Sequence, residues 1–145
     1  MSKLSIKGVL IGSAADLIGS IVLGLPFALY SMSRLDLVNT PKDQVGPTIT
    51  AAIHANIPLY FGQITVGLMC SVLGGYVAAW IAKHDELLNG ALSALPCVTL
   101  SIYIVASGRD SNPRWLQMVL LVASPLLALL GGILMRRRRQ RRTPT

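Results

Sequence analysis

One carboxylate stands alone inside a long apolar segment of this 145-residue chain. Asp16 is the only Asp, Glu, Lys, Arg or His in residues 8–32, and Gly12 and Gly19 share its helical face. An acid inside a bilayer costs about 2.5–3.5 kcal/mol on insertion scales, so it is a functional candidate by default. Asp16 is therefore either a protonatable site for proton-coupled transport or a structural residue. In the structural alternative it hydrogen-bonds to partners among Ser13, Ser20, Gln63, Thr65 and Ser71.

The second chemically capable group is the segment 83–86, Lys-His-Asp-Glu. His84 beside two carboxylates has the residue types of a metal or acid-base site. No partner ligands at metal spacing occur elsewhere in the sequence, and His54 is predicted on the other side of the membrane. The sequence has no nucleophile elbow, phosphate loop, H-E-x-x-H or CxxC motif. We expect no enzymatic activity, metal or cofactor, and we interpret 83–86 as a charged turn.

The elements that position these residues are four long apolar segments. Residues 59–82, 87–107 and 115–135 contain no Asp, Glu, Lys, Arg or His, and 8–32 contains only Asp16. Roughly 20 apolar residues cross a bilayer core as a helix, and these runs lack the alternation of a barrel strand. The sequence predicts an all-α bundle of four transmembrane helices, arranged as two hairpins, over residues 1–135. An outer loop 34–57 and a basic tail 136–145 complete it, and the loop is expected to contain a short helix from Pro47 or an extension of the second span.

Basic residues predict the orientation of the bundle. With both termini in the cytoplasm, nine Lys and Arg residues lie inside and four outside. Because Lys and Arg in short loops favour the cytoplasmic side, we expect both termini inside.

Small residues predict how the helices pack. In lipid there is little hydrophobic force between helices, so association depends on close backbone approach, which small side chains permit. They recur at spacings of three and four along the first and second spans and at the start of the third. The predicted packing residues are Gly12, Gly19, Gly67, Ser71, Gly75, Ala78, Gly90 and Ala94.

The tail RRRRQRRTPT follows the fourth span directly. Its first interpretation is an orientation anchor, and as a surface cluster it also attracts anionic lipid head groups, at about 1 kcal/mol per residue. It is also compatible with a holin-like membrane protein. Nucleic acid is not an expected partner, because no aromatic platform accompanies the arginines. The predicted lipid-contact residues are Arg136, Arg137, Arg138, Arg139, Arg141 and Arg142.

The hairpin LGGYVAAWIAKHDELLNGALSAL resembles that of a loose group of small bacterial four-helix membrane proteins. In that group a GGY-x-A segment ends one helix and a His-Gly-Ala step opens the next, and Asn89 stands where histidine is usual. The resemblance implies the fold and a bacterial inner membrane, but no activity. The chain is also similar to small multidrug transporters in having four helices and an acid in the first, although it is longer and lacks their other motif residues.

These observations predict a structural or accessory subunit of the inner membrane that acts through helix packing. It is expected to form a homo-oligomer or to bind a membrane-protein partner. The alternative is a small proton-coupled transporter or pore, including a holin-like one, that uses Asp16.

Overall fold

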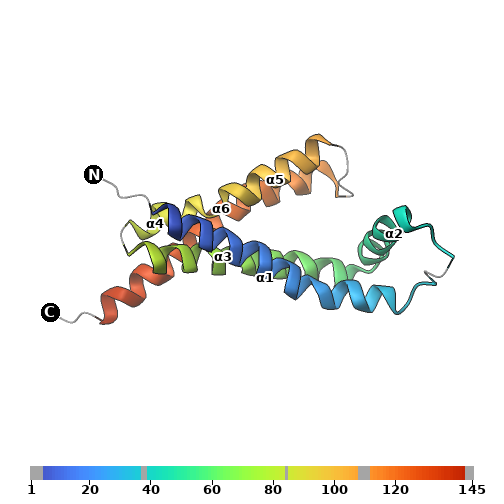
Figure 1. Cartoon of the computed structure of the whole chain (residues 1–145), viewed down its shortest axis with the longest axis horizontal. Coiled ribbons are helices and arrows are strands. Elements are labelled where there is room, and N and C mark those ends of the chain that lie inside the picture. Colours follow the sequence, from blue (N-terminus) through green and yellow to red (C-terminus); the bar gives the residue numbers. More distant parts are fainter. Residues whose placement is uncertain (1–4, 37–38, 84, 108–111, 143–145) are drawn as a thin grey trace.

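The computed structural model describes residues 5–36, 39–83, 85–107 and 112–142, and this part of the chain is helical, without any strand. The predicted all-α fold is therefore confirmed. Figure 1 shows the arrangement of the helices. In chain order they are α1 (Ile6–Met32), α2 (Lys42–Ala55), α3 (Ile57–Ala82), α4 (Glu86–Leu92), α5 (Leu95–Ala106) and α6 (Arg114–Arg142).

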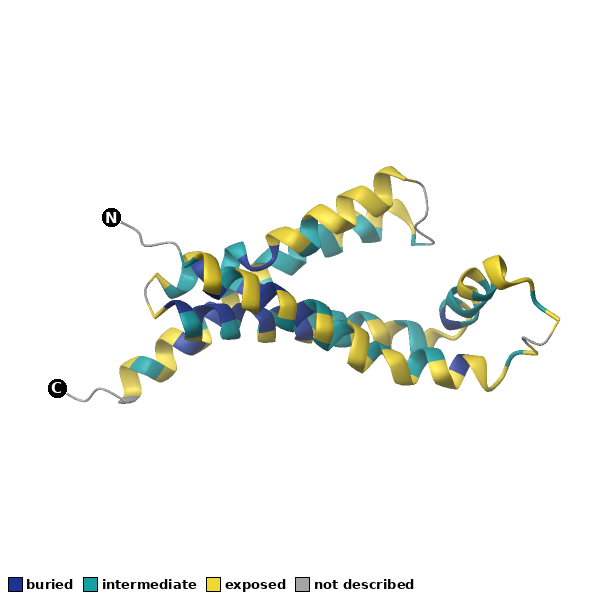
Figure 2. Cartoon of the chain, in the orientation of Figure 1, coloured by how far each residue is buried: buried dark blue, intermediate teal, exposed yellow. Residues whose placement is uncertain are grey.

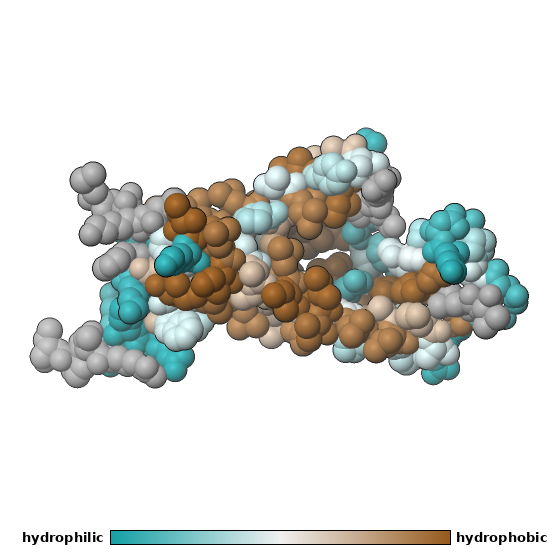
Figure 3. Space-filling model, viewed as in Figure 1, coloured by the Kyte–Doolittle hydropathy of each residue, from teal (hydrophilic) through white to brown (hydrophobic). Residues whose placement is uncertain are grey.

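Four helical segments are long and apolar enough to cross a membrane. They are α1, α3, the pair α4 and α5, and the part of α6 from Arg114 to Arg141, with 27, 26, 21 and 28 residues. A bilayer core requires roughly 20. Large apolar side chains such as Leu10, Ile21 and Val122 point away from the protein, and the surface along the helices is hydrophobic (Figure 3). The chain is thus a small multi-pass membrane protein whose helices contact lipid.

The predicted third span, 87–107, is interrupted. α4 ends at Leu92 and α5 begins at Leu95. Pro96 explains the break, because proline has no N–H and its ring clashes with the carbonyl four residues earlier, here that of Leu92. Within the break, the carbonyl of Ser93 accepts a hydrogen bond from the hydroxyl of Ser13 at 2.7 Å. The interruption therefore attaches α1 to the third span.

The predicted outer loop contains a separate helix, α2, and not an extension of the second span. This helix begins at Lys42, earlier than the expected Pro47, and ends at Ala55. Asn56 then adopts an extended backbone, and its side chain accepts a hydrogen bond from the N–H of Leu59. Asn56 is the N-cap of α3, and this cap separates the two helices.

Helix α6 continues past residue 135, where the sequence placed the end of the fourth span, and includes the basic tail as far as Arg142. Arginine is a good helix former, so the last span extends easily into water. An ion pair between Arg139 and Glu86 fastens this extension to the start of α4.

The helices lie close together at one end of the molecule and separate toward the other (Figure 1). We call the end at which α1 begins and α6 ends the terminal end, and the opposite end the open end. Toward the open end, α5 and the first half of α6 diverge from α1 and α3, and α2 lies beside the far ends of α1 and α3 (Figure 1). Most of the buried residues gather at the terminal end (Figure 2).

Candidate functional site

Close backbone contacts hold α3, α4 and α6 together at the terminal end. A Cβ atom at Gly75 would overlap the backbone carbonyl of Ala128 in α6. A Cβ at Gly90 would lie 3.1 Å from the same carbonyl oxygen and from the Cα of Gly132. Ala94, just past α4, is 1% exposed. Only glycine allows the helices to approach this closely.

Helix α1 joins this contact through its own small residues. A Cβ at Gly12 would lie 2.6 Å from the Cβ of Ala78 and 2.6 Å from the carbonyl oxygen of Gly74. Ala78 itself is fully buried. Gly19, two turns further along, is in looser contact, because a Cβ there would lie 3.4 Å from the Sγ of Cys70. The backbones of α1 and α3 are therefore less close at Gly19, although further toward the open end the ring of Phe27 in α1 packs against Gly62 of α3.

Gly67 has a different position from the other predicted packing residues. No atom lies within 4 Å of the place where its Cβ would be, and the residue lines a cavity. Gly131 and Gly132 of α6, which are not among the predicted packing residues, also make close contacts. A Cβ at Gly131 would overlap the backbone of α3, and one at Gly132 would lie 2.7 Å from the carbonyl oxygen of Glu86. The Gly-Gly pair in LALLGGIL was the signal for them.

Asp16 belongs to α1, and its side chain faces α3 and α5 and is 4% exposed. Its Oδ2 accepts a hydrogen bond from the hydroxyl of Ser71 and another from the thiol of Cys97, both at 3.3 Å. The Ser71 hydroxyl also lies 3.3 Å from that of Ser124 in α6. One carboxylate thus connects polar side chains from all four spans. Of the partners suggested by the sequence, Ser71 donates to it and Ser20 lies nearby on the cavity wall.

Asp16 has no basic partner within the described residues. A buried carboxylate without a cation is costly in a low-dielectric environment, because two hydrogen bonds replace only part of its hydration. This position therefore calls for a proton on the carboxylate or for a cation that the described residues do not supply.

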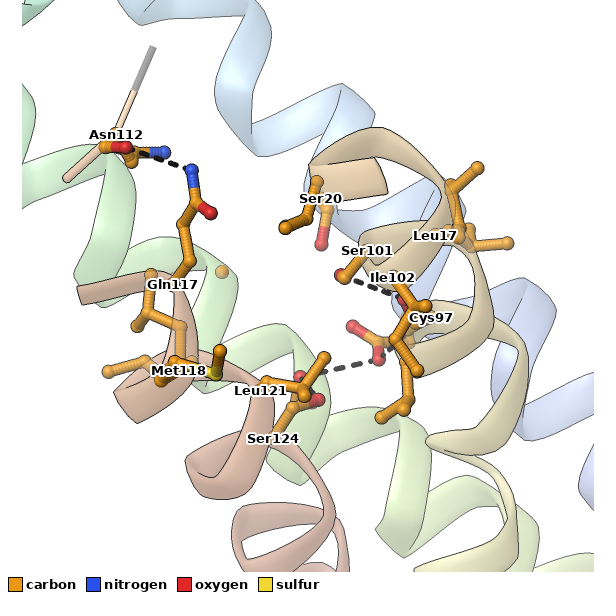
Figure 4. Close-up of a pocket in the computed structure, with 18 of the residues that line it drawn as sticks. Leu17, Ser20, Cys97, Ser101, Ile102, Asn112, Gln117, Met118, Leu121 and Ser124 are labelled. Atoms are coloured by element: carbon orange, nitrogen blue, oxygen red, sulfur yellow. Dashed lines mark hydrogen bonds between the residues drawn. The ribbon is translucent and has the colours of Figure 1, made fainter. Parts of the chain in front are cut away.

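A cavity of about 550 Å³ extends from Asp16 toward the open end. It lies between the α1–α3 pair and the α5–α6 pair, where the space-filling view is hollowed (Figure 3). Figure 4 shows its wall, with Leu17, Ile102 and Leu121 as apolar members. Hydroxyl and amide groups interrupt this apolar surface at Ser20, Ser101, Ser124, Asn112 and Gln117.

The open end of the cavity is bridged by a hydrogen bond. Tyr60 of α3 donates from its hydroxyl to the Oδ1 of Asn112, before α6, at 2.9 Å. Gln117 donates from its Nε2 to the backbone carbonyl of Asn112 at 2.8 Å (Figure 4). The Tyr60–Asn112 bond connects the two diverging helix pairs at a point far from their crossing, and the Gln117 bond holds Asn112 against the start of α6.

The charged turn between the second and third spans has a mainly structural geometry. Lys83 and Asp85 have left-handed backbones, with φ of 58° and 45°. Glu86 is in the first turn of α4 and is paired with Arg139. His84 lies outside the described residues. Where the structure describes the chain, no group of three His, Cys, Asp or Glu side chains is placed to hold a metal ion.

The arginines of the tail fall into two groups. Arg136, Arg137 and Arg141 are exposed along the α6 extension. Arg138 and Arg139 contact the rest of the protein, through Tyr76 and through the 83–86 turn. Arg142 ends the helix, and its side chain lies outside the described part.

Comparisons with known proteins give no relative. No protein-family model matches the chain, and searches of curated proteins and of solved structures found no significant match.

Proposed function

We propose that this protein is a small, non-enzymatic membrane carrier that binds its solute in the cavity, with Asp16 as the binding and proton-exchanging group. The observation that carries the proposal is the Asp16 carboxylate, buried at the inner end of a 550 Å³ cavity and without a cationic partner in the described residues. Intramembrane acids that face a cavity are typical of ion and proton pathways.

The composition of the cavity wall indicates the chemical class of the solute. Its surface is mostly apolar, with hydroxyl and amide groups spread along it. Such a site suits a small molecule with an apolar body and one cationic or hydrogen-bond-donating group. The donor would replace the proton on Asp16, because an ionised carboxylate in this environment needs a positive partner. Solute and proton would then compete for one carboxylate, which is the simplest form of coupled exchange.

Flux measurements test this proposal. The purified protein is reconstituted in liposomes with a pH-sensitive dye inside, and proton flux is driven by an imposed pH gradient in the presence of a small amine with an apolar body as the exchanging solute. We expect the wild-type protein to give flux and Asp16→Asn to give at least about tenfold less, because an amide neither releases nor binds the proton. Asp43→Asn is the matched control, since it removes an exposed carboxylate of α2. Wild-type flux retained by Asp16→Asn, or no flux from a folded wild type, would contradict the proposal.

We also infer that the membrane is a bacterial cytoplasmic membrane, with both termini inside. The asymmetry of Lys and Arg supports this orientation, since it assigns nine basic residues to the cytoplasmic side and four to the outer side. The cavity would then open outward. A C-terminal green fluorescent protein should be fluorescent in this orientation, and a C-terminal alkaline phosphatase should be inactive. The opposite pair of results would reverse the orientation.

A second candidate is an accessory subunit that acts through helix packing. Helix α5 favours it, because none of its residues is buried. Leu100 and Ile102 of this helix are exposed by about half although they also line the cavity. A partner helix, from a second copy or another membrane protein, would cover them. A photo-crosslinker at Leu100 should then give one discrete product in native membranes, and Asp16→Asn should leave its yield unchanged.

A further inference from the structure

A second concave surface lies at the terminal end, between the last two turns of α3 and the extension of α6. It has a volume of about 750 Å³. From α3 it takes Tyr76, Val77 and Trp80, with Lys83 directly after the helix, and from α6 it takes Met135, Arg138 and Arg139. The spacings 76–80 and 135–138–139 place each set on one face of its helix. We call this surface the basic groove.

The two arginines of the basic groove have different roles. Arg139 forms the ion pair with Glu86 and donates from Nη1 to the carbonyl of Lys83 at 2.8 Å, so its charge is balanced. Arg138 donates from Nη1 to the hydroxyl of Tyr76 at 2.6 Å. Neither Arg138 nor Lys83 has an ion pair with a carboxylate of the described residues. The groove thus presents two uncompensated cations, together with a tyrosine hydroxyl that retains its own proton for donation.

The wall of the groove nearer the middle of the membrane is apolar and faces lipid. Trp80 exposes 60% of its surface, one turn before Lys83, and Val77 lies beside it within the membrane-spanning part of α3. An exposed tryptophan at a helix end is typical of the boundary between head groups and acyl chains. Cationic groups on the water side and apolar groups on the membrane side match the head group and the acyl chains of a phospholipid that carries a negative charge.

We propose that the basic groove binds the phosphate group of an anionic phospholipid, with Arg138, Lys83 and the Tyr76 hydroxyl as phosphate ligands and Trp80 against the upper acyl chain. The extension of α6 is therefore more than an orientation anchor. The exposed residues Arg136 and Arg137 do not line the groove and contribute only general attraction. A soluble phosphate compound shares the head-group chemistry, but it has no acyl chain to contact the apolar wall formed by Trp80 and Val77.

Quenching of Trp80 by brominated lipids tests the proposal in the full-length protein. The chain has two tryptophans, so Trp115→Phe leaves Trp80 as the only fluorophore. This background protein is placed in phosphatidylcholine vesicles that contain an equal minor fraction of brominated phosphatidylglycerol or brominated phosphatidylcholine. We expect phosphatidylglycerol to quench Trp80 more strongly. Each basic residue gives about a fivefold preference for anionic lipid, so Lys83→Gln/Arg138→Gln should lower the preference by at least about fivefold.

Two matched variants distinguish lipid binding in the basic groove from general attraction of lipid by the positive charge of the tail. Arg136→Gln/Arg137→Gln removes the same number of positive charges, and it should lower the preference clearly less than Lys83→Gln/Arg138→Gln does, because Arg136 and Arg137 do not line the groove and act on the lipid only at a distance. Lys83→Arg/Arg138→Lys keeps the charge in the groove and should keep most of the preference. Quenching by brominated phosphatidylcholine must be equal in all variants, which shows that Trp80 keeps its place in the bilayer.

Three results would overturn the proposal. The first is no phosphatidylglycerol preference in the Trp115→Phe background. The second is an equal loss in the two glutamine variants, which would mean a diffuse field around the tail and no site in the groove. The third is displacement of the lipid preference by inorganic phosphate at constant ionic strength, which would identify free phosphate as the preferred ligand. None of these outcomes depends on flux through the Asp16 cavity.

Discussion

The terminal end and the open end of the bundle are built from the same three long helices but use small residues in opposite ways. At the terminal end, Gly12, Gly75 and Gly131 bring backbones into contact. Toward the open end, Gly67 and the serines at 20 and 101 face the cavity. A small residue opposite another helix gives close packing, whereas the same residue opposite a diverging helix gives space. Whether a small residue gives packing or space therefore depends on its distance from the point where the helices cross.

This difference assigns separate tasks to the two ends. Helix association in lipid depends on van der Waals contact and on hydrogen bonds between helices. The terminal end has both, since Asn89 is fully buried there and accepts the N–H of Ser5 at 2.8 Å. The open end has few contacts between its two helix pairs, so movement there costs least. Substitutions at the terminal end should therefore change stability, and substitutions at the open end should change access and binding.

The largest expected effect comes from enlarging Gly75. A leucine there would place its side chain in the Ala128 backbone of α6, so α3 and α6 would have to separate. We expect Gly75→Leu to lower the free energy of unfolding by about 3 kcal/mol or more, at the upper end for overpacking. The measurement is unfolding of the detergent-solubilised protein by circular dichroism. Gly67→Leu is the matched control, because it adds the same side chain to the same helix where nothing lies within 4 Å.

Gly67→Leu should keep the fold and partly fill the cavity, so it also separates the two ends by function. Flux or solute binding should fall in this variant while its unfolding curve stays within about 0.5 kcal/mol of wild type. If Gly67→Leu were as destabilising as Gly75→Leu, the open end would be a packed region and the comparison would be wrong.

The sequence predicted the spans because charge-free apolar runs of this length have few other interpretations. It did not separate Gly67 from Gly75, since both lie on the small-residue face of α3 and only the divergence of α6 distinguishes them. The break before α5 follows from Pro96, a residue visible in the sequence, but the use of the Ser93 carbonyl by Ser13 depends on where α1 crosses. Asp16 was found from its type, whereas its link to Cys97 required the tertiary structure.

The next effect in size concerns Asn89. Its Oδ1 accepts the N–H of Ser5, and its Nδ2 donates to the carbonyl of Asp85 at 3.1 Å. Asn89→Ala would remove both bonds from a fully buried position, and we expect a loss of about 2 kcal/mol of unfolding free energy. Asn56→Ala removes an exposed N-cap near the open end and should cost only about 0.5–1 kcal/mol. Equal losses from the two would show that the terminal end has no special role in stability.

A smaller effect is expected at Ser13, which joins α1 to the break in the third span. Ser13→Ala removes the bond to the Ser93 carbonyl, and hydrogen bonds between helices in membranes contribute about 0.6 kcal/mol on average. With both partners buried, we expect a loss of about 1 kcal/mol. Ser101→Ala is the control, since the Ser101 hydroxyl donates to the Cys97 carbonyl within its own helix and is exposed. A loss at Ser101 as large as that at Ser13 would refute the link across helices.

The smallest effect on stability is expected for a change at Tyr60, and the main consequence of that change is easier access from water to the cavity. Tyr60→Phe removes the hydroxyl that donates to Asn112 across the open end, at a cost of only about 0.6 kcal/mol. If this bond holds the helix pairs together, that energy corresponds to about a threefold larger open population. A water-soluble thiol reagent should then modify Cys97 about threefold faster, measured in a Cys70→Ala background. Tyr103→Phe, which changes an exposed tyrosine on α5, should leave the rate unchanged. An equal rate for both variants would mean that the cavity is already open, and the divergence of the helices alone would then set access to Asp16.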